Sequence, residues 1–156
     1  MGHEGFMRRS ITLAERGMRD NQGGPFAALI VKDGRVVAEA HNQVTSANDP
    51  TAHAEVVAIR NACRALAHYS LAGCEIYASC EPCPMCLAAI YWARLDRIYY
   101  ANSRRDAAEI GFDDEFLYRE VALPPDQRAI PAVRLLADEA RAVFDAWQAK
   151  SDKIRY

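Results

Sequence analysis

The sequence predicts an α/β protein of three layers, with a five-stranded mixed sheet between helices. Apolar residues recur at helical spacing in some segments and form continuous strand-like runs in others, and the two kinds alternate. Asp33-Gly34 between two such runs is a strong hairpin signal. The 156 residues, 51% of them hydrophobic, suffice for one core and are too few for two ordinary domains. We therefore expect a single domain over residues 1–156.

The first part of the chain is predicted to hold two helices and an antiparallel pair of strands. Apolar residues at spacings of three and four favour a helix over residues 6–19, which ends before a glycine-rich turn at 21–25. The apolar runs 26–31 and 35–40 flank the hairpin turn and are expected to pair. A second helix is predicted from Asp49 to about Ala67, because Asp-Pro suits a helix cap and first turn.

The remaining segments continue this alternation of strands and helices. In order they predict a strand over 75–79, a helix from Pro82 to about Ala93, a strand over 97–101, a short helix and loop within 102–120, a fifth strand over 130–136 and a terminal helix over 138–150. Pro124-Pro125 separates the last two elements from the rest. The tail after residue 150 shows no pattern of its own.

Charge and cysteine content exclude several classes of function. A formal net charge of −2 provides no general positive field to gather nucleic acid, so small or uncharged substrates are favoured. The sequence has no uninterrupted apolar run of about 18 residues, and its start lacks the apolar core of a signal peptide. Five cysteines, an odd number, favour metal and thiol roles over a disulfide framework. We expect a cytoplasmic protein without a membrane partner.

Two short segments carry the chemistry: His53-Ala54-Glu55 and Pro82-Cys83-Pro84-Met85-Cys86. One histidine and two cysteines supply three zinc ligands, and hydrolytic zinc sites keep a fourth position for water whereas structural sites use four protein ligands. On a helix Glu55 would point about 200° away from His53, so we expect Glu55 to handle protons rather than to bind the metal. The pattern predicts a catalytic zinc site formed by His53, Cys83 and Cys86.

Other interpretations of the cysteines remain open at this point. A Cys-x-x-Cys pair alone also occurs in redox proteins and structural zinc ribbons. Cys80 could complete a structural site with four ligands, although it would lie before the start of the helix that carries the pair. Cys63 and Cys74 are expected to be buried apolar thiols. The presence of Glu55 beside the three ligands favours the hydrolytic site.

The two segments resemble the zinc signature of the cytidine deaminase superfamily, in which His-x-Glu is followed by Pro-Cys-x-x-Cys. The resemblance implies a cytidine deaminase-like fold and one Zn²⁺ per subunit, bound by His53, Cys83, Cys86 and a water. It also implies that Glu55 is the general acid and base. In that role Glu55 moves protons from the water to the substrate ring and to the departing ammonia.

Further segments look like those of bacterial guanine deaminases. They are residues 21–26, Asn42, residues 48–55, 79–94 and 111–114. The resemblance implies hydrolysis of guanine to xanthine and ammonia. Phe26 would stack on the purine, Asn42 would hydrogen-bond it, and Trp92 and Tyr156 would close the pocket. Asp114 would bind the amidine edge and act with Glu55 in catalysis.

The resemblance also implies a homodimer, because proteins of this branch exchange C-terminal segments between two subunits. Two points leave alternatives open. Asp114 could simply cap the helix that follows it. Ala27 stands where the related enzymes carry glycine, so an aminotriazine is an alternative substrate. Cytosine and tRNA adenosine, the substrates of other members of the superfamily, are further alternatives. The net charge argues against an RNA substrate.

Overall fold

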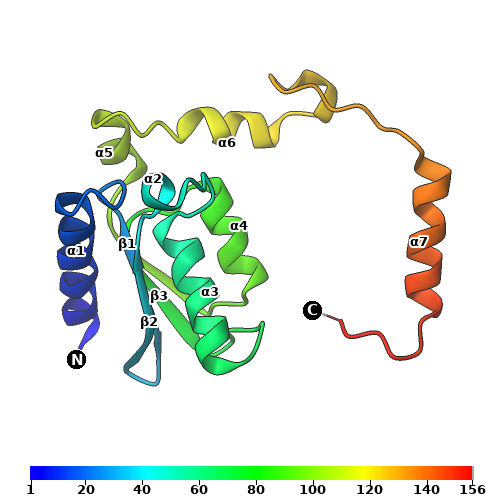
Figure 1. Ribbon diagram of the computed structural model, residues 1–156. Helices are drawn as coiled ribbons and strands as arrows, with labels where there is room; N and C mark the ends of the chain where they lie inside the picture. Colours follow the sequence, from blue (N-terminus) through cyan, green and yellow to red (C-terminus); the bar gives the residue numbers. More distant parts are fainter. Residues whose placement is uncertain (156) are drawn as a thin grey trace. The chain divides into compact units, whose positions relative to one another are not determined.

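The computed structural model describes residues 1–155, and the chain forms two units, Met1–Glu115 and Phe116–Tyr156. The elements of the first unit are α1 (His3–Arg19), β1 (Ala27–Lys32), β2 (Arg35–His41), α2 (Val44–Ala47), α3 (Ala54–Leu66), β3 (Cys74–Cys80), α4 (Pro84–Trp92), β4 (Arg97–Asn102) and α5 (Arg104–Glu109) (Figure 1). Helix α6 (Glu115–Ala122) begins at the boundary, and α7 (Ala137–Ala149) follows a short 3-10 turn at Pro125–Gln127.

The first unit is built on a mixed sheet with the strand order β2-β1-β3-β4. Strand β1 pairs antiparallel with both β2 and β3, whereas β3 and β4 are parallel. The β1–β2 connection turns at Asp33 and Gly34, whose φ angles of 49° and 72° suit a tight hairpin turn. The predicted hairpin is therefore confirmed.

Helices cover both faces of this sheet (Figure 1). Along β1 the buried side chains alternate: Ala28 and Ile30 pack with alanines of α3, whereas Leu29 and Val31 pack with Phe6 of α1. The small residues of α3 allow this helix to lie close to the sheet. Because α3 and α4 lie on the same face, their first turns can meet at one edge of the sheet.

The structure corrects the predicted fifth strand. Within the described residues the sheet has four strands, and residues 130–136 form no strand. Ile130 is 83% exposed and Val133 is 78% exposed. The apolar residues of this segment match a strand pattern. A strand, however, also needs a neighbouring strand with which its backbone can form hydrogen bonds.

Two helix starts also differ from the prediction. Asp49 does not cap α3; its carboxylate accepts hydrogen bonds from the backbone and hydroxyl of Thr51, and α3 begins five residues later at Ala54. Helix α4 begins at Pro84 rather than Pro82. Both helices begin later than predicted because Asp49 and Pro82 lie in turns that precede the helices. The short helix α2 was not predicted.

Within its described residues the second unit contains helices and no strand. None of the described residues from 116 to 155 is buried. A single domain with a C-terminal segment exchanged between subunits stays a prediction. Among the described residues, no helix combines the length and apolarity that a bilayer crossing requires.

Candidate active site

Three predicted metal ligands converge at the first turns of α3 and α4. A ligand atom from each of His53, Cys83 and Cys86 lies within 4.8 Å of the other two. The Nδ1 atom of His53 is 3.6 Å from the sulfur of Cys83 and 3.5 Å from that of Cys86. Tetrahedral zinc with ordinary bond lengths would hold nitrogen and sulfur about 3.6 Å apart. The donor set and its spacing thus fit zinc.

The same local geometry orients the ligands on both helices. His53 is the residue before α3 and has φ −63° and ψ 151°; Cys83 is the residue before α4 and has φ −65° and ψ 168°. This extended backbone turns each side chain toward the beginning of its own helix. Helix N-termini carry partial positive charge, which stabilises thiolates.

The two thiols differ in how readily they ionise. A hydrogen bond from the thiol of Cys86, helped by His53, lowers the pKa of Cys83 to about 4 despite its burial. The same bond, together with burial, raises the pKa of Cys86. Cys83 also raises the pKa of His53 by accepting a hydrogen bond from it. The arrangement therefore favours the thiolate at Cys83 over Cys86, and the thiolate is the form that binds metal.

Glu55 lies in the first turn of α3 and faces the same cavity as His53. It is 8% exposed and is not part of the cluster of ligand atoms. The two side chains do not point apart as a helical projection predicts, because His53 precedes the helix and has an extended backbone. Burial raises the pKa of Glu55 to about 7. A carboxyl group with this pKa can both take and give a proton near neutral pH.

A cavity of about 280 Å³ lies in front of these residues. Its size suits one small ring system, since pockets for larger ligands start near 300 Å³. Its walls bring together, from the predicted site residues, Phe26, Asn42, His53, Glu55, Cys83 and Asp114. These residues come from five different segments of the first unit. The sequence prediction thus identified side chains that the fold places around one space.

The side chain of Asn42 is held by backbone groups on two sides. Its Oδ1 atom accepts hydrogen bonds from the N–H groups of Gly24 and Val44, at 3.2 and 3.1 Å. A Cβ atom at Gly23 would lie 2.3 Å from the carbonyl oxygen of Asn42 and 2.5 Å from Oδ1. The turn therefore requires glycine at this position, and it fixes the amide of Asn42 at the cavity wall.

Phe112 is a cavity residue to which the sequence analysis gave no role. Its ring meets that of Phe26 edge to face, with ring centres 4.8 Å apart. A Cβ atom at Gly24 would lie 3.1 Å from the ring of Phe26 and 3.3 Å from that of Phe112. The only sequence signal for Phe112 is its place in the segment 111–114. The two rings form an apolar corner suited to a flat aromatic ligand.

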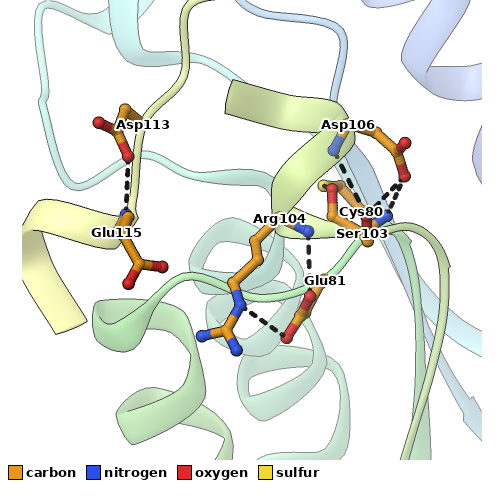
Figure 2. A network of polar contacts seen from close by, with 7 residues as sticks. All are labelled: Cys80, Glu81, Ser103, Arg104, Asp106, Asp113 and Glu115. Carbon is orange, nitrogen blue, oxygen red and sulfur yellow. Dashed lines mark hydrogen bonds and ion pairs between the residues drawn. The ribbon is translucent and has the colours of Figure 1, made fainter. Parts of the chain in front are cut away.

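The structure separates the roles of two adjacent aspartates. Figure 2 shows that the side chain of Asp113, through Oδ1, accepts the first N–H of α6, from Glu115, at 2.9 Å. Asp114 lines the cavity instead. Burial, reinforced by the negative charge of Cys83, raises the pKa of Asp114. Asp113 thus satisfies the first N–H of α6, while its neighbour Asp114 borders the cavity.

Trp92 lies outside the cavity, whereas Cys80 borders it without joining the ligand cluster. Trp92 ends α4, is 66% exposed and borders a surface hollow with Tyr91 rather than the cavity. Tyr156 lies outside the described residues. Cys80 ends β3 and its thiol donates to the carbonyl oxygen of Ser103 at 3.7 Å. Cys80 is not in the ligand cluster, so a structural site with four cysteine and histidine ligands does not form here.

Comparison with known proteins agrees with this geometry. Residues 1–102 match the family model described as the cytidine and deoxycytidylate deaminase zinc-binding region. Over 156 residues the chain is 52% identical to guanine deaminase from Bacillus subtilis, and the match covers all of both chains. The chain belongs to the guanine deaminase family. Its zinc-binding residues are His53, Cys83 and Cys86.

Other relatives place this family within the zinc-binding deaminases. An X-ray structure of guanine deaminase from Bacillus subtilis matches with a TM-score of 0.98 and covers 100% of this chain and 99% of that one. The chain is also 41% identical over 101 residues to the tRNA-specific adenosine deaminase of Aquifex aeolicus, which covers 65% of this chain and 66% of the relative. The predicted cytidine deaminase-like fold is thus confirmed, with a four-stranded sheet.

Proposed function

We propose that this protein hydrolyses guanine to xanthine and ammonia, using one Zn²⁺ per subunit. The observation that carries the proposal is the shared cavity of Glu55, Asp114 and the zinc ligands. Guanine presents two adjacent N–H donors, at a ring nitrogen and at the exocyclic amine, and one carboxylate can accept from both. The place of Asp114 in the cavity wall, with the first N–H of α6 bound by Asp113 instead, supports this use.

Each cavity residue has a separate task in the proposed reaction. Zinc at the site would supply activation of water as a nucleophile. Glu55 takes a proton from the attacking water and passes it to the ring nitrogen beside the amino-bearing carbon. It then takes the second proton from that oxygen and delivers it to the amino group, which leaves as ammonia while the carbonyl group of xanthine forms. Asp114 holds the amidine edge, Asn42 bonds the ring and Phe26 stacks on its face.

The direct test measures ammonia released from guanine, guanosine, adenine, cytosine and the aminotriazine ammeline, each offered separately. We expect rapid release from guanine with formation of xanthine, and rates at least about tenfold lower for the other compounds, because only guanine suits all the polar groups at once. Protein whose zinc has been removed by a chelator provides the control. Preference for adenine or cytosine would reject the assignment of guanine and leave the zinc site intact.

We further propose that two copies of the chain form a homodimer by exchanging their C-terminal units. The second unit exposes large apolar side chains, including Ile130, Val133, Leu135 and Phe144. The sheet of the first unit ends at β4, whose outer edge has no strand beside it among the described residues. An apolar segment of strand-like pattern and an open sheet edge are complementary. The exchange would also bring Tyr156 of one subunit to the pocket of the other, whereas Trp92 lies on α4 of the first unit and is not exchanged.

Light scattering after gel filtration tests this assembly. The full chain is expected to elute with the mass of two chains. Replacing Phe144 and Val143 with serine should shift the protein toward monomer, because both side chains are exposed in a single chain and would be buried in the dimer. Replacing the exposed Arg141 with serine on the same helix serves as the control. A wild-type protein that is monomeric at all concentrations would reject the exchange.

We also propose a reducing, cytoplasmic location. In the described residues all five cysteines are free thiols. Two of them belong to the zinc site, whose thiolate chemistry requires reduced sulfur.

A further inference from the structure

Glu81 lies in the cavity wall between the end of β3 and the zinc ligand Cys83. Its backbone N–H donates to the carbonyl oxygen of Asn102 at 2.8 Å. Its carboxylate accepts the backbone N–H of Arg104 at 3.0 Å, and its other oxygen lies 3.9 Å from the guanidinium Nε of the same residue. Figure 2 shows that both carboxylate oxygens face Arg104. A carboxylate occupied in this way is poorly placed to exchange protons with a substrate.

The bond to Arg104 completes the beginning of α5. Ser103 and Asp106 form a capping box in which each satisfies a backbone N–H of the other. Arg104 is the first residue of the helix, and its N–H has no partner within α5 because the first N–H groups of a helix never do. Glu81 supplies that partner. The segment that leads to the zinc ligands is thereby tied to the start of α5.

The other end of α5 carries the cavity loop. The N–H of Phe112 donates to the carbonyl oxygen of Ala107, and that of Gly111 donates to Ala108, both at 3.0 Å. Gly111 has a φ angle of 93°, which closes this end of the helix as glycine commonly does. Ala107 is 5% exposed and itself borders the cavity. Two backbone hydrogen bonds therefore join Phe112 and its loop to the end of α5.

We propose that Glu81 is a positioning residue that fixes Phe112 and Asp114 relative to the zinc ligands by holding the first turn of α5. The inference rests on the proposed function for its kinetic consequences. Glu81 precedes the zinc ligand Cys83 by two residues, and its proposed role is to hold α5 rather than to bind metal. Glu81 would then help to position both the ring of Phe112 and the carboxylate of Asp114.

Arg104→Pro tests the link without breaking the helix. Proline lacks the N–H that Glu81 accepts, and it is well tolerated at the first position of a helix after an extended residue. Ser103, with φ −84° and ψ 166°, is already extended. We expect KM for guanine to rise about tenfold, because a hydrogen bond to a charged group is lost. We expect kcat and zinc content to change little.

Arg104→Ala is the matched control, because it removes the guanidinium and keeps the N–H. It should retain the wild-type KM within about twofold, since exposed ion pairs contribute little. Glu81→Gln, which keeps an acceptor oxygen, should lie near this control, whereas Glu81→Ala should resemble Arg104→Pro. Equal effects of Arg104→Ala and Arg104→Pro on KM would overturn the proposal, as would a wild-type KM in Arg104→Pro.

Hydrogen exchange provides a readout that does not depend on the substrate. In Arg104→Pro the amides of Gly111 and Phe112 should exchange faster than in wild type, while those of β3 should not change. If the wild-type protein released no ammonia from guanine, the proposed function would fail and this measurement would still decide whether the link holds α5. Unchanged exchange at both amides would reject it.

Discussion

Replacing Glu55 with glutamine is expected to reduce kcat for guanine by about 10²–10⁴-fold while zinc stays bound. Glutamine has nearly the same shape but cannot carry a proton between water, ring and leaving amine. Zinc should remain because Glu55 is not part of the ligand cluster. Ammonia release gives the rate, and elemental analysis of the same sample gives the zinc content per chain.

Glu4→Gln is the control for this change. Glu4 is exposed on α1 and pairs with Arg8 on the surface, so its loss should leave kcat within about twofold. A Glu55→Gln variant that turns over at the wild-type rate would eliminate Glu55 as the proton carrier. Loss of zinc along with activity would instead assign Glu55 a role in holding the site together.

Asp114→Asn is expected to lower kcat/KM for guanine by about ten- to a hundredfold, because charge-assisted hydrogen bonds contribute about 1.5–3 kcal/mol. An asparagine could accept one guanine N–H through its oxygen, but its NH₂ group would oppose the second donor. Initial rates over a range of guanine concentrations measure the effect. Zinc content should be that of the wild type.

The neighbouring Asp113→Asn change supplies a matched control with the same chemistry one residue away. Asparagine caps a helix about as well as aspartate does, so the N–H of Glu115 would keep its partner. We expect kcat/KM within about threefold of wild type. Comparable losses in the two variants would mean that the loop needs its total charge, and that Asp114 has no specific contact with guanine.

The zinc ligands could be predicted because their residue types and their short spacing in the sequence are typical of zinc sites. Cys83 and Cys86 lie one helical turn apart, and His53 with Glu55 repeats a known pattern. The structure adds a detail that the spacing alone does not give. Both His53 and Cys83 precede their helices, so backbone geometry, rather than a helix face, aims them.

Other features depend on contacts between distant segments and could not be predicted from local patterns. Residues 130–136 match a strand pattern, but whether they pair depends on a sheet edge elsewhere. Asp113 and Asp114 are identical side chains, and only the fold assigns one to a helix start and the other to a cavity. In the sequence Phe112 looks like any other apolar residue, and only the structure shows that its ring contacts that of Phe26.

The position of the ligands at two helix starts also makes the metal a cross-link. His53 and Cys83 are 30 residues apart in sequence, and the segment between them includes all of α3 and β3. Zinc held by both would close this loop much as a disulfide does, which restricts the unfolded chain and so favours the folded one. Chelation should therefore lower the melting temperature as well as stop turnover. One zinc ion would then contribute both to the reaction and to the thermal stability of the central sheet.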